Sequence, residues 1–292
     1  PDSKIRAASI KDKDYPLRDG EGLKIIIRTS GTKTWQYDYQ FIGKTKTYTI
    51  GQYPLISALE ARERAAELRS IISDVEKFKA AVYTFRTKYN AIPGDMVEAQ
   101  AIWGAAADCA TAQTTTATCN GNGNNALENY TPSGVIGNER FLFWKHLANA
   151  GLIAGNYIGI ADGTTDYSAT TNNAPSGKMS RSLWHASYRG VLNGQLYAFD
   201  GVYNNVLQYG GYYVDADPLY PIISPSEAFA TDSKFDDGKP GTGNMVIRIG
   251  TFNNQCAVAA DGSTAAVATD TTTATYKTTD DKRCTLIFPK AF

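Results

Sequence analysis

One helical stretch decides the fold: LEARERAAELRSIISDVEKFKAAVYTFRTKYN, residues 59–90. Its second half carries apolar residues at alternating spacings of three and four, which is typical of a helix that buries one face. The stripe consists of Val75, Phe78, Val82, Phe85 and Tyr89. Because Pro93 and Gly94 forbid continuation, we expect the helix to end before residue 91.

The chain differs in charge and in cysteine content on the two sides of residues 70–75. Residues 1–70 hold 13 Lys and Arg against 9 Asp and Glu, and no Cys. Residues 71–292 hold 16 Lys and Arg against 20 Asp and Glu, together with all four Cys. A basic head (1–70) joined to an acidic body (71–292) indicates a module for a polyanion attached to a part with another task. We therefore expect two domains with these bounds.

Three runs in the head alternate in period two, at 23–29, 35–41 and 44–50. Such runs, separated by glycine-containing turns, predict a three-stranded antiparallel sheet. Ser57 and Glu60 then have the spacing of a capping box, so a helix is expected to begin there. We expect this helix to pack across the aromatic face of the sheet, running through Leu59, Arg62, Ala66 and Arg69.

Several short motifs follow one another through the head. They are Asp19-Gly20-x-Gly22-Leu23, Ser30-Gly31-x-Lys33-x-Trp35, Tyr39, Gly43-Lys44, Gly51-x-Tyr53-Pro54 and Ser57-x-x-Glu60-Ala61-Arg62. Together they resemble the N-terminal arm-type DNA-binding domain of prophage tyrosine integrases. Members of that family lay the sheet in the major groove at arm sites.

The resemblance implies double-stranded DNA as the partner of the head. The outward positions that would contact DNA are Lys24, Arg28, Gln36, Gln40, Lys44 and Lys46. Lys and Arg would contact mainly phosphate, while Gln could read base edges. Asp38 on the same run would repel phosphate, and the alternative is that the lysines form only a solvated face.

An integrase also needs a catalytic domain with Arg, His-x-x-Arg and a nucleophilic Tyr. Here His185 is followed by Arg189 four places on, and His146 by Asn149. Nothing after residue 70 resembles a recombinase. We therefore expect no catalytic residues, no enzyme activity and no cofactor.

The body is expected to complete an α+β fold. A helical patch runs from Glu139 and ends at Gly151, and Tyr- and Ile-rich runs follow it. These runs predict strands of an antiparallel sheet, separated by long loops. They span 196–199, 206–213, 244–249 and 284–288. The long helix is expected to pack on this sheet.

Four further motifs lie between residues 75 and 153. They are Val75-Glu76-Lys77-Phe78, Tyr89 through Met96, Ala101-x-Trp103-Gly104 and Phe143-Trp144-x-His146-Leu147-x-x-Ala150-Gly151-Leu152-Ile153. Together they resemble the soluble part of a type IV pilin-like or type II secretion pseudopilin-like protein. The resemblance implies a structural or adhesive filament subunit whose partners are other pilin subunits. The apolar first half of the pilin helix is replaced by the head, so we expect neither filament assembly nor membrane insertion.

The cysteines form two pairs that are close in sequence, Cys109/Cys119 and Cys256/Cys284. Four Cys permit three pairings, and we predict nearest-neighbour disulfides. A metal site is the alternative, but no Cys-x-x-Cys is present, so no metal ligands are assigned. Disulfides would place the native body in a periplasmic or extracellular space and the native head in the cytoplasm. No export signal is recognised in the chain.

For other candidate residues the sequence gives weaker support for a function. Residues 120–124 have the rhythm of a calcium loop, but Asn stands where Asp is expected, so a plain flexible loop is favoured. Asp232, Asp236 and Asp237, and likewise Asp280 and Asp281, are clustered acids without a partner His. His146 is expected to be packed or at the surface, and His185 in the core. The aromatic residues of 157–220 are expected to form a sheet core, with a binding face as the alternative.

These observations favour a non-enzymatic fusion of an arm-type DNA-binding head and a pilin-like body. One alternative is a DNA-binding regulator or integrase fragment in which the body only supports the head. Another is a DNA-binding minor pilin. A cytosolic head on a disulfide-bearing body favours engineering or a gene rearrangement as the origin of the join.

Overall fold

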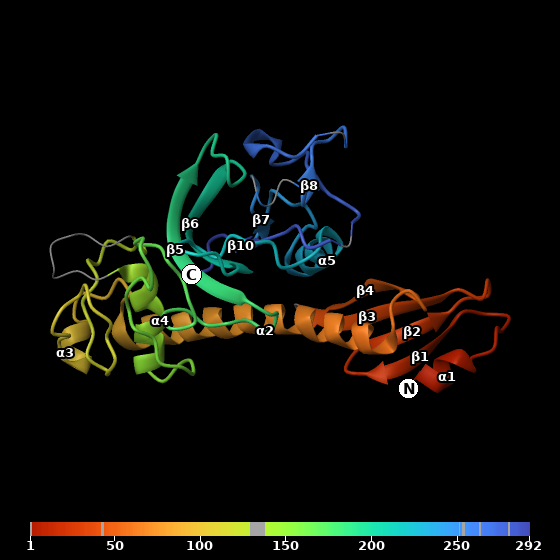
Figure 1. Cartoon of the computed structure of the whole chain (residues 1–292), viewed down its shortest axis with the longest axis horizontal. Helices are drawn as coiled ribbons and strands as arrows, with labels where there is room; N and C mark the ends of the chain where they lie inside the picture. The colour runs from red at the N-terminus through yellow and green to blue at the C-terminus, as the bar shows by residue number, and fades with distance from the viewer. Residues whose placement is uncertain are drawn as a thin grey trace. The chain divides into compact units, whose positions relative to one another are not determined.

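The computed structural model describes residues 2–41, 44–128, 138–250, 252, 255–262, 264–279 and 281–292, without the side chains of 39–41, 44, 46, 234 and 235. The chain divides into two compact units, Pro1–Ile72 and Ser73–Phe292. Helix α2 (Ala58–Tyr89) contributes residues to both of them. Each unit is described by itself below (Figure 1).

The first unit contains a four-stranded antiparallel sheet in the order β1-β2-β3-β4. Helix α1 (Asp2–Arg6) precedes β1 (Tyr15–Gly20), β2 (Leu23–Ile27), β3 (Lys33–Phe41) and β4 (Lys44–Tyr53). The predicted sheet of three strands was therefore wrong by one strand. Tyr15 pairs with Ile27 in an added edge strand, where Pro16 is tolerated because an edge strand has a free side.

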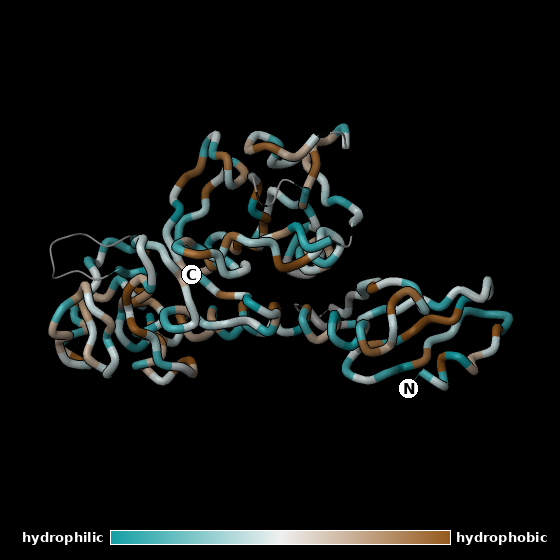
Figure 2. Tube along the Cα trace, viewed as in Figure 1, coloured by the Kyte–Doolittle hydropathy of each residue, from teal (hydrophilic) through white to brown (hydrophobic). Residues whose placement is uncertain are grey.

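One cluster of buried side chains fills the space between this sheet and the first half of α2. Trp35 is fully buried, and its indole N–H donates to the carbonyl of Ile56 at 3.1 Å. Figure 2 shows the alternation of apolar and polar segments along these strands. The cluster consists of Ile5, Leu23, Ile25, Ile27, Trp35, Tyr37, Ile50, Ile56, Ala58, Ala61 and Ala65.

The helix packs on the sheet through small residues, while Arg62 and Arg69 contact Asp19, Glu21 and Tyr37. Ala61 and Ala65 are buried against the sheet, whereas Leu59 is 64 % exposed. Small side chains allow a helix axis to come close to a sheet that already presents Trp and Tyr. The cap is formed as predicted on one side, because the backbone N–H of Glu60 donates to Ser57 Oγ at 3.2 Å.

A bulge in β4 fits Ile50 into the core. Trp35 pairs with Gly51 and Gln36 pairs with Thr49, so Ile50 has no partner of its own across the ladder. Gly51 has φ of 150°, and a Cβ there would meet Ile56 Cδ1 at 2.3 Å. Glycine is therefore required where the bulge brings β4 against the chain that leads into α2.

The second unit combines helices with two antiparallel sheets. The larger sheet has the order β5-β6-β10-β7, and the smaller pairs β8 with β9. The elements after α2 are α3 (Ala99–Trp103), α4 (Glu139–Asn149), β5 (Ser182–Leu192), β6 (Gly201–Gly211), α5 (Pro225–Phe235), β7 (Val246–Ile247), β8 (Ala257–Val258), η1 (Ala268–Asp270), β9 (Thr275–Tyr276) and β10 (Leu286–Phe288). Both units therefore mix helices and antiparallel strands.

The predicted strand at 196–199 was wrong, since these residues lie between β5 and β6. Leu196 is 87 % exposed there. The strand that precedes them, β5, was missed because most of its first half is buried on both faces. A strand buried in this way does not show the period-two alternation by which the other strands were recognised.

The C-terminal half of α2 packs on the larger sheet and on α4. Phe78 meets the ring of Trp144 at 5.0 Å and that of Trp184 at 5.5 Å between centroids. Trp184 also donates from its indole N–H to Asp74 at 3.3 Å. Val75, Phe78, Val82 and Phe85 are each at most 2 % exposed, so the predicted stripe faces the core. The helix ends at Tyr89, as expected from Pro93 and Gly94.

Both disulfides join nearest neighbours, as predicted. Cys109 bonds to Cys119 and Cys256 bonds to Cys284, and all four residues are buried. The first pair packs against Leu142 of α4. The second fixes the chain before β8 to the residue that leads into β10. Among the residues that the structure describes, no helix combines the length and apolar character needed to cross a membrane.

Candidate nucleic-acid interface

One row of side chains crosses all four strands of the first unit on the face opposite α2. Arg18 of β1 pairs with Lys24 of β2, Lys24 with Gln36 of β3, and Gln36 with Thr49 of β4. Residues paired in register lie on the same face of a sheet, and these alternate with the buried core residues. The cross-strand row (Arg18, Lys24, Gln36 and Thr49) therefore offers two cations, an amide and a hydroxyl on one surface.

Lys24, at the centre of this row, is neutralised within the domain. Its Nζ lies 2.6 Å from Asp38 Oδ2, and Thr47 Oγ1 donates to Asp38 Oδ1 at 2.5 Å. Burial alone would raise the pKa of Asp38, but hydrogen bonds from Lys24 and Thr47 and the charges of Lys24 and Arg18 hold it below its usual value. The carboxylate therefore stays ionised and competes with any phosphate for Lys24.

Arg18 is the cation of the row that sequence reasoning missed. Its side chain is exposed, and no residue in the described part of the chain forms an ion pair or hydrogen bond with it. It was missed because β1 was not recognised, although Tyr15 and Leu17 alternate with Pro16 and Arg18 as a half-buried strand requires. Arg18 is thus better placed to meet a phosphate than Lys24.

The other residues predicted to contact DNA do not all lie on the cross-strand row. Arg28 follows the end of β2, where it pairs with Asp14 at 2.8 Å, and this hydrogen bond holds the pKa of Asp14 below its usual value. The side chains of Gln40, Lys44 and Lys46 lie outside the described residues. In backbone register Lys44 pairs with Phe41 and Lys46 with Tyr39. By strand alternation, these two positions belong to the face of the sheet opposite the cross-strand row.

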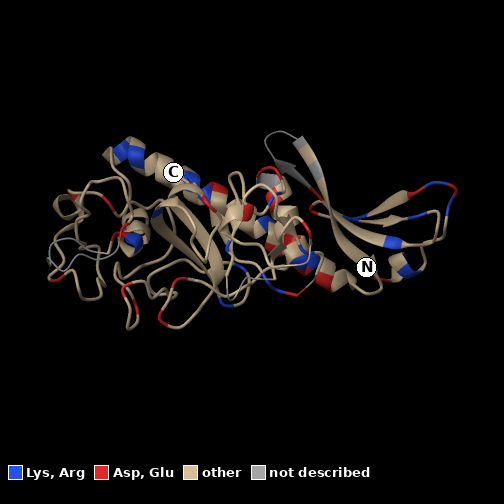
Figure 3. Cartoon of the chain, turned by 90° about the horizontal axis from the view of Figure 1, so that it is seen from above, with Lys and Arg blue, Asp and Glu red and all other residues tan. Residues whose placement is uncertain are grey.

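Two acids at the β1–β2 turn are bound by arginines of α2. Arg62 donates to both carboxylate oxygens of Asp19, at 2.6 and 2.9 Å. Arg69 pairs with Glu21 and donates to the hydroxyl of Tyr37 at 3.2 Å. These contacts tie the helix to the turn and neutralise acids of the same strand pair that carries Arg18. Figure 3 shows basic and acidic residues interspersed in this unit.

Comparison with known proteins supports this assignment of the first unit. Residues 1–80 match the Arm DNA-binding domain family. An integrase of Shigella phage Sf6 and the prophage integrase IntS of Escherichia coli strain K12 are each 46 % identical over 69 residues, which are 24 % of this chain and 18 % of each relative. The prophage integrase IntA of the same strain is 40 % identical over 74 residues, 25 % of this chain and 18 % of the relative.

The fold and these similarities define the N-terminal part of the chain as an arm DNA-binding domain of the kind found in prophage integrases. The chain spans about a fifth of the length of the curated relatives it matches, since 18 % of each is covered. The shared segment is therefore the N-terminal domain alone.

In the second unit, His146 is a buried structural residue. The backbone N–H of Gly94 donates to its Nδ1 at 3.0 Å, and its Nε2 lies 3.2 Å from the carbonyl of Cys119. Burial lowers the pKa of His146 to about 3. Because Nδ1 accepts a hydrogen bond, the proton of the neutral ring is on Nε2. The histidine joins three segments of the fold through these contacts.

The Asn-rich loop 120–124 surrounds carboxylates with hydrogen-bond donors. The backbone N–H groups of Gly123 and Asn124 donate to Asp95 Oδ1 at 2.6 and 3.1 Å. Asn122 N donates to Glu139 at 2.8 Å, and burial raises the pKa of Glu139 to about 7. A calcium loop presents acceptors instead, so this geometry does not resemble one. The expectation of a plain flexible loop was also wrong, since two buried acids fix it.

The acids Asp232, Asp236 and Asp237 come together at the end of α5, with one ligand atom from each within 4.8 Å of the others. Tyr276 donates to Asp232 at 2.8 Å, and burial raises the pKa of Asp232 to about 8. Asp237 accepts the backbone N–H of Lys239 at 2.8 Å. The described contacts fasten the segment after α5. Asp280 lies outside the described residues.

The aromatic residues of 157–220 divide between the core and the surface. Trp184 and Tyr209 are at most 1 % exposed, and their rings are in tilted contact with centroids 4.6 Å apart, as expected of a sheet core. Tyr188 and Tyr220 are each 40 % exposed. The core interpretation therefore holds for the residues on β5 and β6 that face α2, and not for the whole region.

Proposed function

We propose that this chain binds double-stranded DNA through the outward face of the sheet in its first unit. The observation that carries the proposal is the cross-strand row, which places Arg18, Lys24 and Gln36 side by side on three strands. Strands can present side chains to the major groove, where base edges are distinguishable. The family match and the similarity to integrases support DNA as the partner.

The three residues have different roles in this proposal. Arg18 contacts phosphate directly, because no described residue forms an ion pair or hydrogen bond with it. Lys24 contacts phosphate only after it leaves Asp38. The loss of that ion pair offsets part of the attraction between Lys24 and the phosphate. Gln36, on the far side of Lys24 from Arg18, presents a donor and an acceptor that match the N7 and N6 atoms of adenine. Phosphate contacts fix the register of the domain, and the amide supplies sequence preference.

The test is an equilibrium titration of the full chain against a labelled duplex that carries an arm-type site. Arg18→Gln should weaken binding and reduce the slope of log affinity against log salt by about one, because one phosphate contact is lost. Lys178→Gln, at an exposed lysine of the second unit, is the matched control and should leave both quantities unchanged. Equal losses in the two variants would reject the role given to the row.

The second unit is proposed to be the soluble part of a filament subunit of the pilin or pseudopilin type, with an extracytoplasmic location in its native setting. This proposal is favoured by the apolar stripe of α2 against an antiparallel sheet, and by the disulfide between Cys256 and Cys284. No catalytic step is assigned to either unit. The alternative is an integrase fragment or regulator in which the second unit only supports DNA binding.

Thiol reactivity separates these two proposals for the second unit. The chain should be isolated from its native host under conditions that trap thiols, denatured, and titrated with a thiol reagent. Four blocked cysteines would favour the extracytoplasmic filament subunit, since disulfides persist in oxidising compartments. Four reactive cysteines would favour the DNA-binding fragment acting in the cytoplasm.

A further inference from the structure

Three arginines of the second unit surround a single carboxylate. Arg189 of β5 lies 2.7 Å from Asp217 Oδ2, and Arg140 of α4 lies 3.9 Å from Asp217 Oδ1. Arg248, just after β7, also acts on this carboxylate through its charge. The side chains of Arg140 and Arg189 are each 13 % exposed and that of Asp217 is 11 % exposed. The arginine cluster (Arg140, Arg189, Arg248 and Asp217) is thus largely removed from water.

Each arginine of this cluster has one buried nitrogen without a described hydrogen-bond partner. Arg189 donates to Asp217 at 2.7 Å and to Gln208 at 3.1 Å, but its Nε has no partner. The 3.9 Å separation of Arg140 from Asp217 is too long for a hydrogen bond. His185 Nε2 lies 3.5 Å from Asp217 Oδ1. The buried atoms without a described hydrogen-bond partner are Arg140 Nε, Arg189 Nε, Arg248 Nη1, Asp217 Oδ1 and both ring nitrogens of His185.

The charges of the cluster do not balance. Three guanidinium groups face one carboxylate, and His185 is neutral because burial lowers its pKa to about 4. Asp166 acts on Arg140 from further away, and within the described residues it makes no ion pair with it. Buried charges are normally paired, and buried donors are normally satisfied by protein, water or an ion. Counted against Asp217, the three guanidinium groups leave an excess of positive charge that Asp166 offsets only from a distance.

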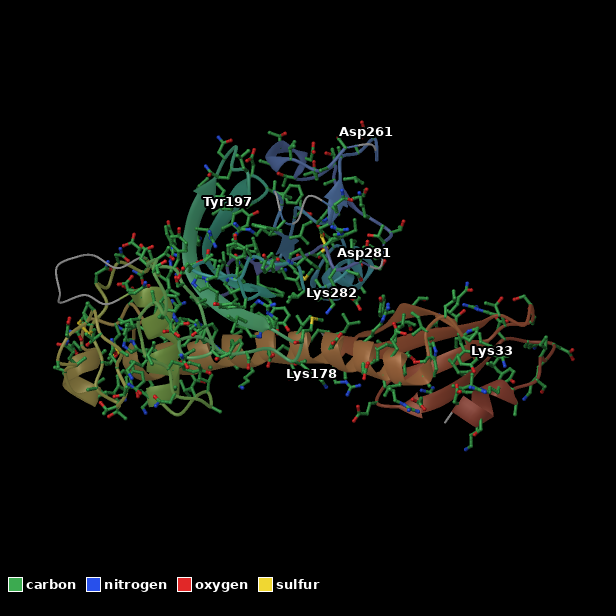
Figure 4. The ribbon with its side chains drawn as sticks, in the orientation of Figure 1. Lys33, Lys178, Tyr197, Asp261, Asp281 and Lys282 are labelled. Atoms are coloured by element: carbon green, nitrogen blue, oxygen red, sulfur yellow. A yellow bond between two sulfur atoms is a disulfide. The ribbon has the colours of Figure 1, made fainter. Side chains whose placement is uncertain are left out.

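Tyr197 orients two of the three arginines. The guanidinium carbon of Arg248 lies 5.1 Å from the centroid of its ring, and that of Arg189 lies 5.6 Å from it. Cation–π contacts of this kind hold a guanidinium without occupying its N–H groups. Figure 4 labels Tyr197 in the connection between β5 and β6. The ring thus holds two guanidinium groups without occupying the nitrogens that have no described partner.

We propose that the arginine cluster binds a small tetrahedral oxyanion with two negative charges, of the phosphate or sulfate class. Guanidinium groups match the paired oxygens of such an anion, and its negative charge opposes the excess positive charge of the cluster. Asp217 remains ionised, because the surrounding cations outweigh the effect of its burial on its pKa. The carboxylate therefore keeps Arg189 in place while Arg140 and Arg248 turn their free donors to the ligand.

Isothermal titration of the full chain with inorganic phosphate, and separately with sulfate, tests the proposal directly. Chloride at matched ionic strength is the control for general salt effects. Saturable binding of one anion per chain, with competition between phosphate and sulfate, is the expected result. The absence of saturable binding of either anion by the parent protein would overturn the proposal without any variant.

Two substitutions locate the site. Arg140→Gln and Arg248→Gln each remove donors that have no described partner, so each should weaken phosphate binding at least about tenfold. Arg283→Gln, at an exposed arginine that pairs only with Asp281 among described residues, should bind phosphate like the parent. Circular dichroism confirms that each variant is folded. Parent-like phosphate affinity in folded Arg140→Gln and Arg248→Gln would overturn the assignment.

Discussion

Lys24 Nζ lies 2.6 Å from Asp38 Oδ2 on the outward face of the first sheet, and both side chains are at most one-fifth exposed. This ion pair sits in the surface that the domain is proposed to offer to DNA. Each phosphate that reaches Lys24 must therefore displace a carboxylate. The pair makes the sheet a weaker and less salt-sensitive DNA binder than its count of basic residues indicates.

Asp38→Asn should strengthen DNA binding. The amide keeps the shape of the side chain and its contact with Thr47 but no longer neutralises Lys24. Affinity for any duplex should rise roughly five- to tenfold, and the salt slope should steepen by about one. The cost in stability should be within about 1 kcal/mol. Fluorescence anisotropy over a salt series measures the two binding quantities, and an unchanged slope would show that Lys24 does not contact phosphate.

Gln36→Ala should change sequence preference more than general affinity. An amide that bonds to a base edge contributes discrimination between sites, which we expect to fall roughly tenfold. The salt slope should stay as in the parent, because no phosphate contact is removed. Parallel titrations with an arm-site duplex and a scrambled duplex give both numbers. A uniform loss on the two duplexes would assign Gln36 to backbone positioning instead.

Phe78→Ala should destabilise the second unit by about 3–5 kcal/mol, since it removes a buried ring that contacts Trp144 and Trp184. Tyr83→Ala on the same helix is the control, because Tyr83 is 75 % exposed. It should cost less than about 1 kcal/mol. Chemical unfolding followed by tryptophan fluorescence compares the two. Similar losses would mean that the stripe of α2 is not what holds the unit together.

The stability of the second unit should depend on pH through Glu139. Its pKa is raised from 4.5 to about 7 in the folded protein, so the folded state binds this proton more tightly than the unfolded state. The stabilisation is complete below about pH 4.5 and is lost as the pH rises to about 7.

Glu139→Gln should remove this part of the profile. Parent and variant should therefore differ in pH dependence by up to about 3 kcal/mol between the two limits. His146 has the opposite sign, because its pKa is lowered to about 3 and its stabilisation is lost as the pH falls below 6.5. The comparison of variant with parent isolates Glu139, and Glu76→Gln at an exposed position of α2 is the control. Parallel parent and Glu139→Gln profiles would contradict the assignment.

Local patterns predicted most elements whose two faces differ. They missed β5, whose first half is buried on both faces, and β1, whose alternation includes a proline. Strands β2 to β4 and the stripe of α2 alternate buried and exposed residues, so their sequence carries the signal. Strand β1 contains Pro16 and a turn-like Asp19-Gly20, and β5 is buried on both faces at its start. The nearest-neighbour disulfides followed from spacing alone.

The candidate sites show the same limit. Lys24 and Gln36 were found because outward positions of a strand can be read from alternation. Arg18 was missed along with its strand. The pairing of Lys24 with Asp38 joins residues 14 positions apart through strand register, which local pattern does not specify. The arginine cluster unites Arg140, Arg189 and Arg248 from separate elements, so only the tertiary fold reveals it.

The measurement that tests the central claim most directly is cross-linking of the full chain to an arm-site duplex that carries photoreactive bases and backbone positions. Mass spectrometry of the products identifies the linked peptides. The account predicts cross-links in residues 15–53, concentrated on the strands that carry Arg18, Lys24 and Gln36. Cross-links confined to residues 73–292 would contradict it.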